Sequence, residues 1–178
     1  GVTMVQLREK NATTREFVQE ALAIKVILKQ KNVPLIINDR VDVALAVDAD
    51  GVHIGQNDMS WRMTRHLLGP DKLIGLSIES AEQLEDANKA DIDYIGISPV
   101  FTTPTKEELE KGLGLKGTAE IANKSVHPSV AIGGIKRDNA AEVLNTGVNG
   151  ISVVSAICSA EDPEAAARNL AEIVEKDH

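Results

Sequence analysis

The sequence predicts one α/β domain over residues 1–178, a parallel TIM (β/α)8 barrel of which seven βα units are present. Strand-like and helix-like segments alternate along the chain, which is typical of a parallel sheet with helices outside it. Similar helix-to-strand junctions precede every second strand, at residues 48–52, 90–94 and 146–151. Residues 1–3 resemble the tail of one more junction, so we expect the first strand and helix to be missing and the domain to be N-terminally truncated. A doubly wound open sheet is the alternative, but it gives no reason for this repeat.

In the first half of the chain we expect strands at 2–7, 35–37, 52–54 and 73–78, and helices at 14–31, 41–47 and 60–68. The long helix is indicated by Phe17, Ala21, Ile24 and Leu28, which recur at the three- and four-residue steps of a helix with one buried face. The two apolar runs around the short amphipathic segment 41–47 form a right-handed βαβ unit, so their strands are parallel.

In the second half we expect strands at 94–98, 130–132 and 151–154, and helices at 80–89, 116–124, 139–145 and from 162 onward. Ser80 with Gln83 three residues later is a capping box for the first of these helices. Asp162 and Pro163 provide an N-cap and a first-turn proline for the last one. The longest loop, 99–114, lies between a strand and a helix.

Composition limits the classes of partner and compartment. Hydrophobic residues make up 43% of the 178 residues, which suffices for one core. The net charge of −8 argues against nucleic acid or an anionic membrane, because no basic run is present to neutralise a polymer of phosphates. Cys158 is the single cysteine, which excludes an intrachain disulfide and favours the cytoplasm. No apolar run reaches the roughly 20 residues of a membrane span. A homo-oligomer stays open.

Polar residues follow the predicted strands at their carboxyl ends, which open onto one mouth in a barrel. The strand-end segments that carry them are Gln6, Leu7, Arg8, Glu9 and Lys10, then Asn38 and Asp39, Gln56 to Asp58, Ser77, Thr102 to Lys106, Gly133 and Gly134, and Ser155. Asp39 and Asp58 leave the same sheet edge, and two carboxylates brought together repel unless a cation or proton lies between them. Mg²⁺ accepts one or two carboxylates together with phosphate and water, so these two aspartates predict a Mg²⁺ site. Each of them could instead cap the helix that follows it.

The same strand ends indicate phosphate binding. Arg8, Lys10 and Lys106 supply cations, and Ser77, Thr103 and Thr105 supply hydroxyl donors. The turns at Gly134 and Ser155 offer backbone N–H groups. We find no nucleophile paired with a base, so the pattern favours departure of a metal-bound diphosphate over hydrolysis. Taken alone, the cationic loop after the first strand could be an ordinary solvated loop, and His53 is expected in the core.

These residues resemble the thiamine-phosphate synthase family. The matching stretches are VQLREK at 5–10, IINDRVDVALAVDADGVHIGQND at 36–58, GLS at 75–77, ISPVFTTPTK at 97–106, GLG at 112–114, VAIGGI at 130–135 and GVNGISVVSAI at 147–157. The resemblance implies a (β/α)8 barrel enzyme that joins 4-amino-2-methyl-5-hydroxymethylpyrimidine diphosphate to a thiazole phosphate, giving thiamine phosphate and diphosphate.

The resemblance also implies roles for individual residues. The pyrimidine diphosphate would be held by residues Gln6, Leu7, Arg8, Glu9, Lys10, Asn38, Ser77 and Lys106, of which Arg8, Lys10, Ser77 and Lys106 are the implied catalytic set. The thiazole phosphate would meet Thr103, Pro104, Thr105, Gly134, Val154 and Ser155. Mg²⁺ would be held by Asp39 and Asp58.

Two departures from the family pattern stand near the site. Glu79 takes a position where many relatives have a histidine, and Glu107 with Glu108 makes the long loop acidic. The rival hypotheses are a thiazole tautomerase on the same barrel and a catalytically silent phosphate-binding barrel. Asp39, Asp58 and Lys106 favour the synthase, because a tautomerase has no diphosphate for Mg²⁺ to bind.

Overall fold

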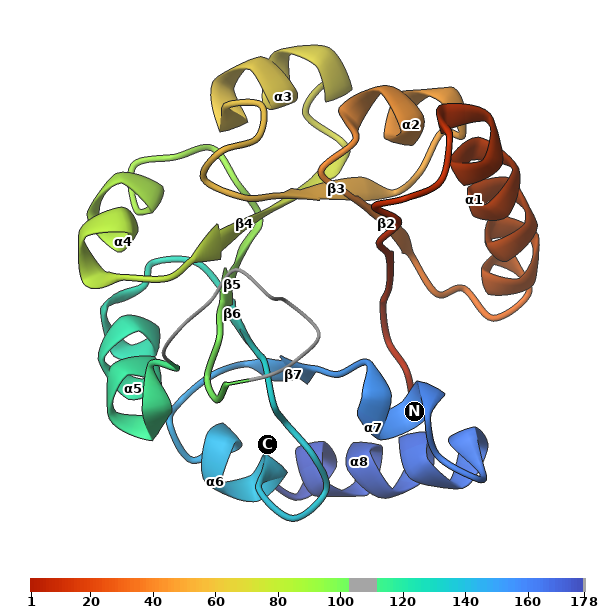
Figure 1. Ribbon diagram of the computed structural model, residues 1–178. Helices are drawn as coiled ribbons and strands as arrows, with labels where there is room; N and C mark the ends of the chain where they lie inside the picture. The colour runs from red at the N-terminus through yellow and green to blue at the C-terminus, as the bar shows by residue number, and fades with distance from the viewer. Residues whose placement is uncertain (103–111, 178) are drawn as a thin grey trace. The chain divides into compact units, whose positions relative to one another are not determined.

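The computed structural model describes residues 1–102 and 112–177, and in these ranges strands and helices alternate as predicted (Figure 1). Contacts divide the chain into two compact units. The β1–β4 unit comprises residues 2–77 and 90–93. The β5–β7 unit comprises Gly1, Ile78–Lys89 and the residues from Tyr94 onward. Each unit is a parallel sheet with helices against it, which confirms the α/β class.

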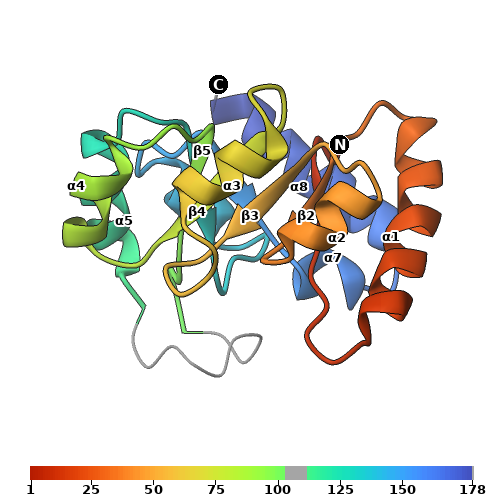
Figure 2. The same cartoon turned by 90° about the horizontal axis from the view of Figure 1, so that it is seen from above.

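The β1–β4 unit contains strands β1 (Val5–Leu7), β2 (Leu35–Asn38), β3 (Gly51–Ile54) and β4 (Leu73–Ile78), and helices α1 (Thr14–Lys29), α2 (Val41–Ala46) and α3 (Trp61–Leu68). Neighbouring strands pair in parallel in the order of the chain. The helices lie along one side of β2 and β3, and a second view shows α1 beside α2 (Figures 1 and 2). Phe17 and Ala21 of α1 are fully buried, as the helical period predicted.

The β5–β7 unit contains strands β5 (Tyr94–Ile97), β6 (Ser129–Ile132) and β7 (Gly150–Ser152), and helices α4 (Ala81–Ala87), α5 (Gly114–Lys124), α6 (Ala140–Leu144), α7 (Ser155–Cys158) and α8 (Pro163–Asp177). Its strands also pair in parallel and in sequence. The C-terminal helix α8 packs against α6 and α7. Ser80 Oγ accepts the backbone N–H of Gln83, which confirms the Ser80 half of the predicted capping box of α4. The Gln83 side chain instead accepts the backbone N–H of Glu79.

The predicted junction repeat has a common hydrogen bond. In each junction, the side chain before a strand accepts a backbone N–H from the start of the preceding strand at 2.8 Å, namely Asp50 from Leu35, Asp93 from Ile74 and Asn149 from Ser129. The backbone N–H groups of the same three acceptor residues bond back to the carbonyl groups of these partners. In each junction an aspartate or asparagine therefore binds the backbone at the start of the preceding strand through both its side chain and its N–H group.

Three details differ from the prediction or extend it. The first strand is shorter than expected, since regular pairing begins only at Val5. Helix α7 was not expected, because four residues are too few to show a helical period. Within residues 1–102 and 112–177 the structure has seven strands, the predicted number, and eight helices. The single domain over 1–178, closure into an eight-unit barrel and the missing first unit stay predictions.

Candidate functional site

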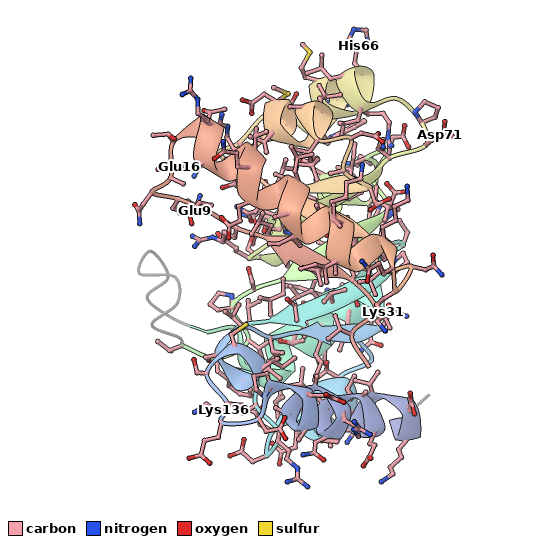
Figure 3. All side chains as sticks on the ribbon, turned by 90° about the vertical axis from the view of Figure 1, so that its right-hand side faces the viewer. Glu9, Glu16, Lys31, His66, Asp71 and Lys136 are labelled. Carbon is pink, nitrogen blue, oxygen red and sulfur yellow. The ribbon has the colours of Figure 1, made fainter. Side chains whose placement is uncertain are left out.

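The carboxyl ends of the strands in the β1–β4 unit lie at one end of that unit. In Figure 3, Glu9 follows β1 at one end, whereas Lys31 and Asp71, which lie before β2 and β4, are at the other. This arrangement follows from parallel pairing, which directs every strand the same way. The polar residues predicted after β1, β2, β3 and β4 therefore come from the same end.

Asp39 occupies a left-handed backbone conformation directly after β2. Its φ of 62° is uncommon for any residue except glycine, although aspartate and asparagine tolerate it best. The backbone N–H of Asp39 donates to the carbonyl of His53 at 2.8 Å, and the N–H of Arg40 donates to Asn38 at 2.7 Å. The strand thus ends in a tight turn. Arg40 is the N-cap of α2 and makes no side-chain cap bond, so the structure does not support a capping role for Asp39.

Asp58 is held by its own turn after β3. Its Oδ2 atom accepts the backbone N–H of Gly55 at 2.7 Å. A Cβ atom at Gly55 would come within 3.0 Å of that oxygen, so glycine leaves room for the carboxylate. The N-cap of α3 is Ser60, whose hydroxyl accepts from Met63 N–H. The alternative that Asp58 caps this helix is therefore wrong.

The two aspartates share their electrostatic environment with one lysine. Lys10 Nζ lies 2.5 Å from Asp39 Oδ2. Burial alone would raise the pKa of Asp39, but the hydrogen bonds from Lys10 and Asp58 bring it below its ordinary value. Burial and then the neighbouring Asp39 raise the pKa of Asp58. Burial and mutual repulsion therefore oppose the ionisation of both carboxylates at once.

This donor set suits a hard divalent cation. Two carboxylates converge at the sheet end, and among the described residues no group of three or more His, Cys, Asp or Glu side chains forms a closed metal site. A cation held by Asp39 and Asp58 alone would need oxygen ligands from a bound phosphate and from water, as Mg²⁺ usually does. The geometry therefore fits a metal shared with a phosphate ligand better than a structural metal.

The loop after β1 presents cations next to the acidic pair. Arg8 and Lys10 are exposed, whereas Gln6 and Leu7 are half-buried in β1. Glu9 stabilises this loop, since its carboxylate accepts the backbone N–H groups of Asn11 and Ala12 at 2.9 and 3.3 Å. These hydrogen bonds lower the pKa of Glu9, and they hold its carboxylate against the backbone of the turn.

Asn38 and Ser77, which were predicted near strand ends, lie there in β2 and β4, and the structure shows that both are buried. The structure adds two neighbours of Ser77. Nε2 of His53 lies 2.9 Å from Ser77 Oγ, and Gln56 Nε2 donates to the Ser77 carbonyl at 2.7 Å. His53 was expected as a core or barrel-interior residue, with a functional role as the less favoured alternative. The sequence signal that could have indicated this contact is the polar imidazole of His53 in the middle of an apolar strand, two residues before Gly55.

The β5–β7 unit carries its own set of predicted phosphate-binding residues. Gly133 and Gly134 follow β6 with φ of 107° and 65°. A Cβ atom at Gly134 would come within 2.7 Å of Phe101 Cβ, so this close approach requires glycine. Val154 is exposed after β7, and Ser155 begins α7. Thr103, Pro104, Thr105 and Lys106, like Glu107 and Glu108, lie outside the described residues.

A hollow of about 390 Å³ lies elsewhere in the β1–β4 unit, near the amino ends of β2 and β3. Two of its lysines are paired within the protein. Lys25 Nζ donates to the carbonyl of Val47 at 2.9 Å, and Lys72 Nζ lies 2.5 Å from Asp48 Oδ1. These bonds occupy two of the three lysines that line the hollow, and we assign no ligand to it.

Comparisons with known proteins agree on one family. A family model described as thiamine monophosphate synthase matches residues 1–157. A thiamine-phosphate synthase of Vibrio campbellii is 55% identical over 170 residues, which cover 96% of this chain and 83% of the relative. The Vibrio parahaemolyticus protein of the same name is 53% identical over 98% of this chain and 86% of its own length.

Solved structures extend the similarity to the fold. A thiamine phosphate pyrophosphorylase from Pyrococcus furiosus matches with a TM-score of 0.91 and 42% identity, covering 99% of this chain and 85% of that one. A 3-hexulose-6-phosphate synthase from Salmonella typhimurium has a TM-score of 0.74 at 15% identity, over 98% of this chain and 87% of that one. The second likeness is one of fold alone.

Proposed function

This chain belongs to the thiamine monophosphate synthase family, and from this premise we propose that it transfers a hydroxymethylpyrimidine group from its diphosphate to a thiazole phosphate. The products are thiamine phosphate and diphosphate, which makes the protein a transferase of thiamine biosynthesis. Relatives at 53–55% identity that carry the name thiamine-phosphate synthase support this function. They do not favour the tautomerase or the silent barrel.

The acidic pair is the observation that carries the chemistry. Asp39 and Asp58 converge beside Lys10 at the strand ends of the β1–β4 unit, and burial together with the nearby Asp39 raises the pKa of Asp58. A second positive charge would offset the repulsion between the two carboxylates. We propose that Mg²⁺ is that charge, held by Asp39 and Asp58 together with oxygens of the substrate diphosphate. When bound, it would neutralise negative charge that builds up on the leaving group.

The residues of this chain then act on the same leaving group. As the bond between the pyrimidine methylene carbon and the diphosphate oxygen breaks, its electron pair goes to the diphosphate. Arg8 and Lys10 are placed on the loop after β1 to stabilise that charge, and Ser77 is placed on β4 to donate a hydrogen bond to it. Lys106 is assigned the same role from the family pattern. The lone pair of the thiazole nitrogen forms the new bond to carbon, so no general base is needed at that nitrogen.

Binding of the two substrates divides between the two sets of residues. We assign the pyrimidine diphosphate to residues of the β1–β4 unit together with Lys106, that is, to Gln6, Leu7, Arg8, Glu9, Lys10, Asn38, Ser77 and Lys106. The thiazole phosphate is assigned to Thr103, Pro104, Thr105, Gly134, Val154 and Ser155. The left-handed backbone at Gly134, which lacks a side chain, supports a backbone site for phosphate.

The partners that we propose for this protein are its small-molecule substrates. No helix in residues 1–102 or 112–177 is long and apolar enough to cross a membrane. We propose a cytoplasmic location on the basis of the single cysteine, and no nucleic-acid or membrane partner on the basis of the net charge of −8. The sequence also allows the protein to form a homo-oligomer.

One incubation separates the candidate functions. The protein is mixed with the pyrimidine diphosphate, the thiazole phosphate and Mg²⁺, and both products are followed by chromatography. Equal amounts of thiamine phosphate and diphosphate are expected, with none formed in the presence of a chelator. Isomerised thiazole phosphate without coupling would instead identify a tautomerase, and binding without turnover would identify a silent barrel.

A further inference from the structure

We propose that His53 is a positioning residue for this reaction, which holds the Ser77 hydroxyl as a hydrogen-bond donor to the diphosphate. The inference rests on the proposed function, because it deepens the role given there to Ser77. His53 is only 3% exposed and Ser77 only 7%, and 2.9 Å separates Nε2 of the first from Oγ of the second. Two buried polar groups in such contact orient each other strongly.

Strand register brings the two side chains together. His53 of β3 lies opposite Gly75 of β4, and Ser77 is two residues farther along the same strand. Alternate residues of a strand face the same side of the sheet, so Ser77 faces the side that His53 faces. Gly75 has no side chain at the intervening position, which leaves the imidazole room to reach the hydroxyl.

Gln56 binds the backbone of Ser77, whereas His53 binds its hydroxyl. Its side-chain N–H donates to the Ser77 carbonyl at 2.7 Å, which fixes the backbone of that residue from the strand end of β3. His53 then controls the one remaining freedom, the direction of the hydroxyl proton. The two residues together fix both the position and the polarity of Ser77.

The count of protons decides the direction of the bond. A serine hydroxyl has one proton and two lone pairs, and the outer oxygens of a diphosphate are acceptors. If Ser77 donated its proton to His53, it would face the diphosphate with lone pairs only and would repel it. The productive arrangement therefore has the N–H at Nε2 of His53 donating to Ser77 Oγ, while Ser77 O–H donates to the diphosphate.

The test compares His53→Leu, His53→Gln, Ser77→Ala and the double variant His53→Leu with Ser77→Ala. Glutamine can place an amide N–H near the position of Nε2, so His53→Gln should stay within a few-fold of the parent. His53→Leu should lower kcat/KM for the pyrimidine diphosphate about 10- to 100-fold, as loss of a residue that orients a metal ligand does. It should leave KM for the thiazole phosphate unchanged. In the Ser77→Ala background, His53→Leu should cause no further loss.

A binding measurement supplies a readout besides activity. Calorimetry with inorganic diphosphate and Mg²⁺ should give weaker binding for His53→Leu and Ser77→Ala, and nearly parental binding for His53→Gln. His66→Leu is the matched control, since it makes the same change on the exposed face of α3 and should alter neither binding nor turnover (Figure 3). Should His53→Leu fail to fold, His53→Asn replaces it, because its shorter amide cannot reach Ser77.

Two results would overturn the role of His53. One is an equal loss from His53→Leu in the parent and in the Ser77→Ala background, and the other is parental diphosphate affinity in a folded His53→Leu or His53→Asn variant. Failure of the proposed function is a separate outcome, seen as absence of coupling by the parent protein. Diphosphate binding by the same variants still decides the role of His53 in that case.

Discussion

The carboxylate of Asp93 accepts a hydrogen bond of 2.8 Å from the backbone N–H of Ile74, near the start of β4. The same oxygen lies 2.8 Å from the guanidinium of Arg65, whose side chain is only 13% exposed. Arg65 also donates to the carbonyls of Gly69 and Lys72, which lie in the connection between α3 and β4. One aspartate therefore secures a strand, a helix and the loop between them.

Replacement of Asp93 by alanine should destabilise the β1–β4 unit. It leaves the Ile74 N–H group without this acceptor and removes one carboxylate from a largely buried arginine, so we expect a loss of about 1–3 kcal/mol. Urea denaturation followed by circular dichroism measures the change. Asp71→Ala, in the exposed loop before β4, is the control and should change stability by less than about 0.5 kcal/mol. Equal stability of the two variants would contradict the role of the junction hydrogen bond.

Asp39→Asn should abolish Mg²⁺-dependent turnover while the fold stays intact. The substitution keeps the shape of the side chain but removes the charge that a divalent cation requires. Initial rates across a Mg²⁺ titration, together with a thermal melt, provide the measurement. Asp71→Asn removes the same charge far from the strand ends and should keep the parental rate. Unchanged activity of Asp39→Asn would exclude Asp39 from the metal site.

Mg²⁺ affinity should fall as the pH is lowered toward the raised pKa of Asp58. The metal requires both carboxylates ionised, whereas the free protein keeps a proton on Asp58 to a higher pH than the ordinary value of 3.8. Mg²⁺ binding should therefore release a proton in that range. Isothermal calorimetry in buffers of different ionisation enthalpy detects this release. An affinity that stays constant down to pH 4 would rule out Asp58 as a ligand.

Without metal, Asp58→Asn should stabilise the protein at neutral pH. The folded-state pKa of Asp58 is raised, so its contribution to stability is fully present below the unfolded-state pKa and is lost as the pH rises through the folded-state value. Asparagine removes the repulsion from Asp39 and still has an oxygen to accept the Gly55 N–H. Thermal melts in chelator should show a higher Tm for Asp58→Asn at pH 7 than for the parent. That advantage should disappear at pH 3, and a lower Tm at pH 7 would refute it.

Local sequence signals predict the order and direction of the helices and strands. Helical period at Phe17 and Ala21, the N-cap at Ser80 and the repeated junction before every second strand are local signals, and each is present in the structure. Parallel strands follow from alternation with helices, and this placed Asn38, Asp39, Asp58 and Ser77 at strand ends. Helix α7 was missed because four residues carry too little periodic signal.

Which of these strand-end groups are in contact depends on how the strands and turns pack together. The pairing of Lys10 with Asp39 joins residues 29 positions apart, and the contact of His53 with Ser77 joins residues 24 apart. Such contacts depend on strand register, on the left-handed turn at Asp39 and on side-chain direction, and none of these is encoded in a local pattern. Hydrogen bonds require placement within a few tenths of an ångström, so only the packed sheet could distinguish a positioning histidine from an ordinary core residue.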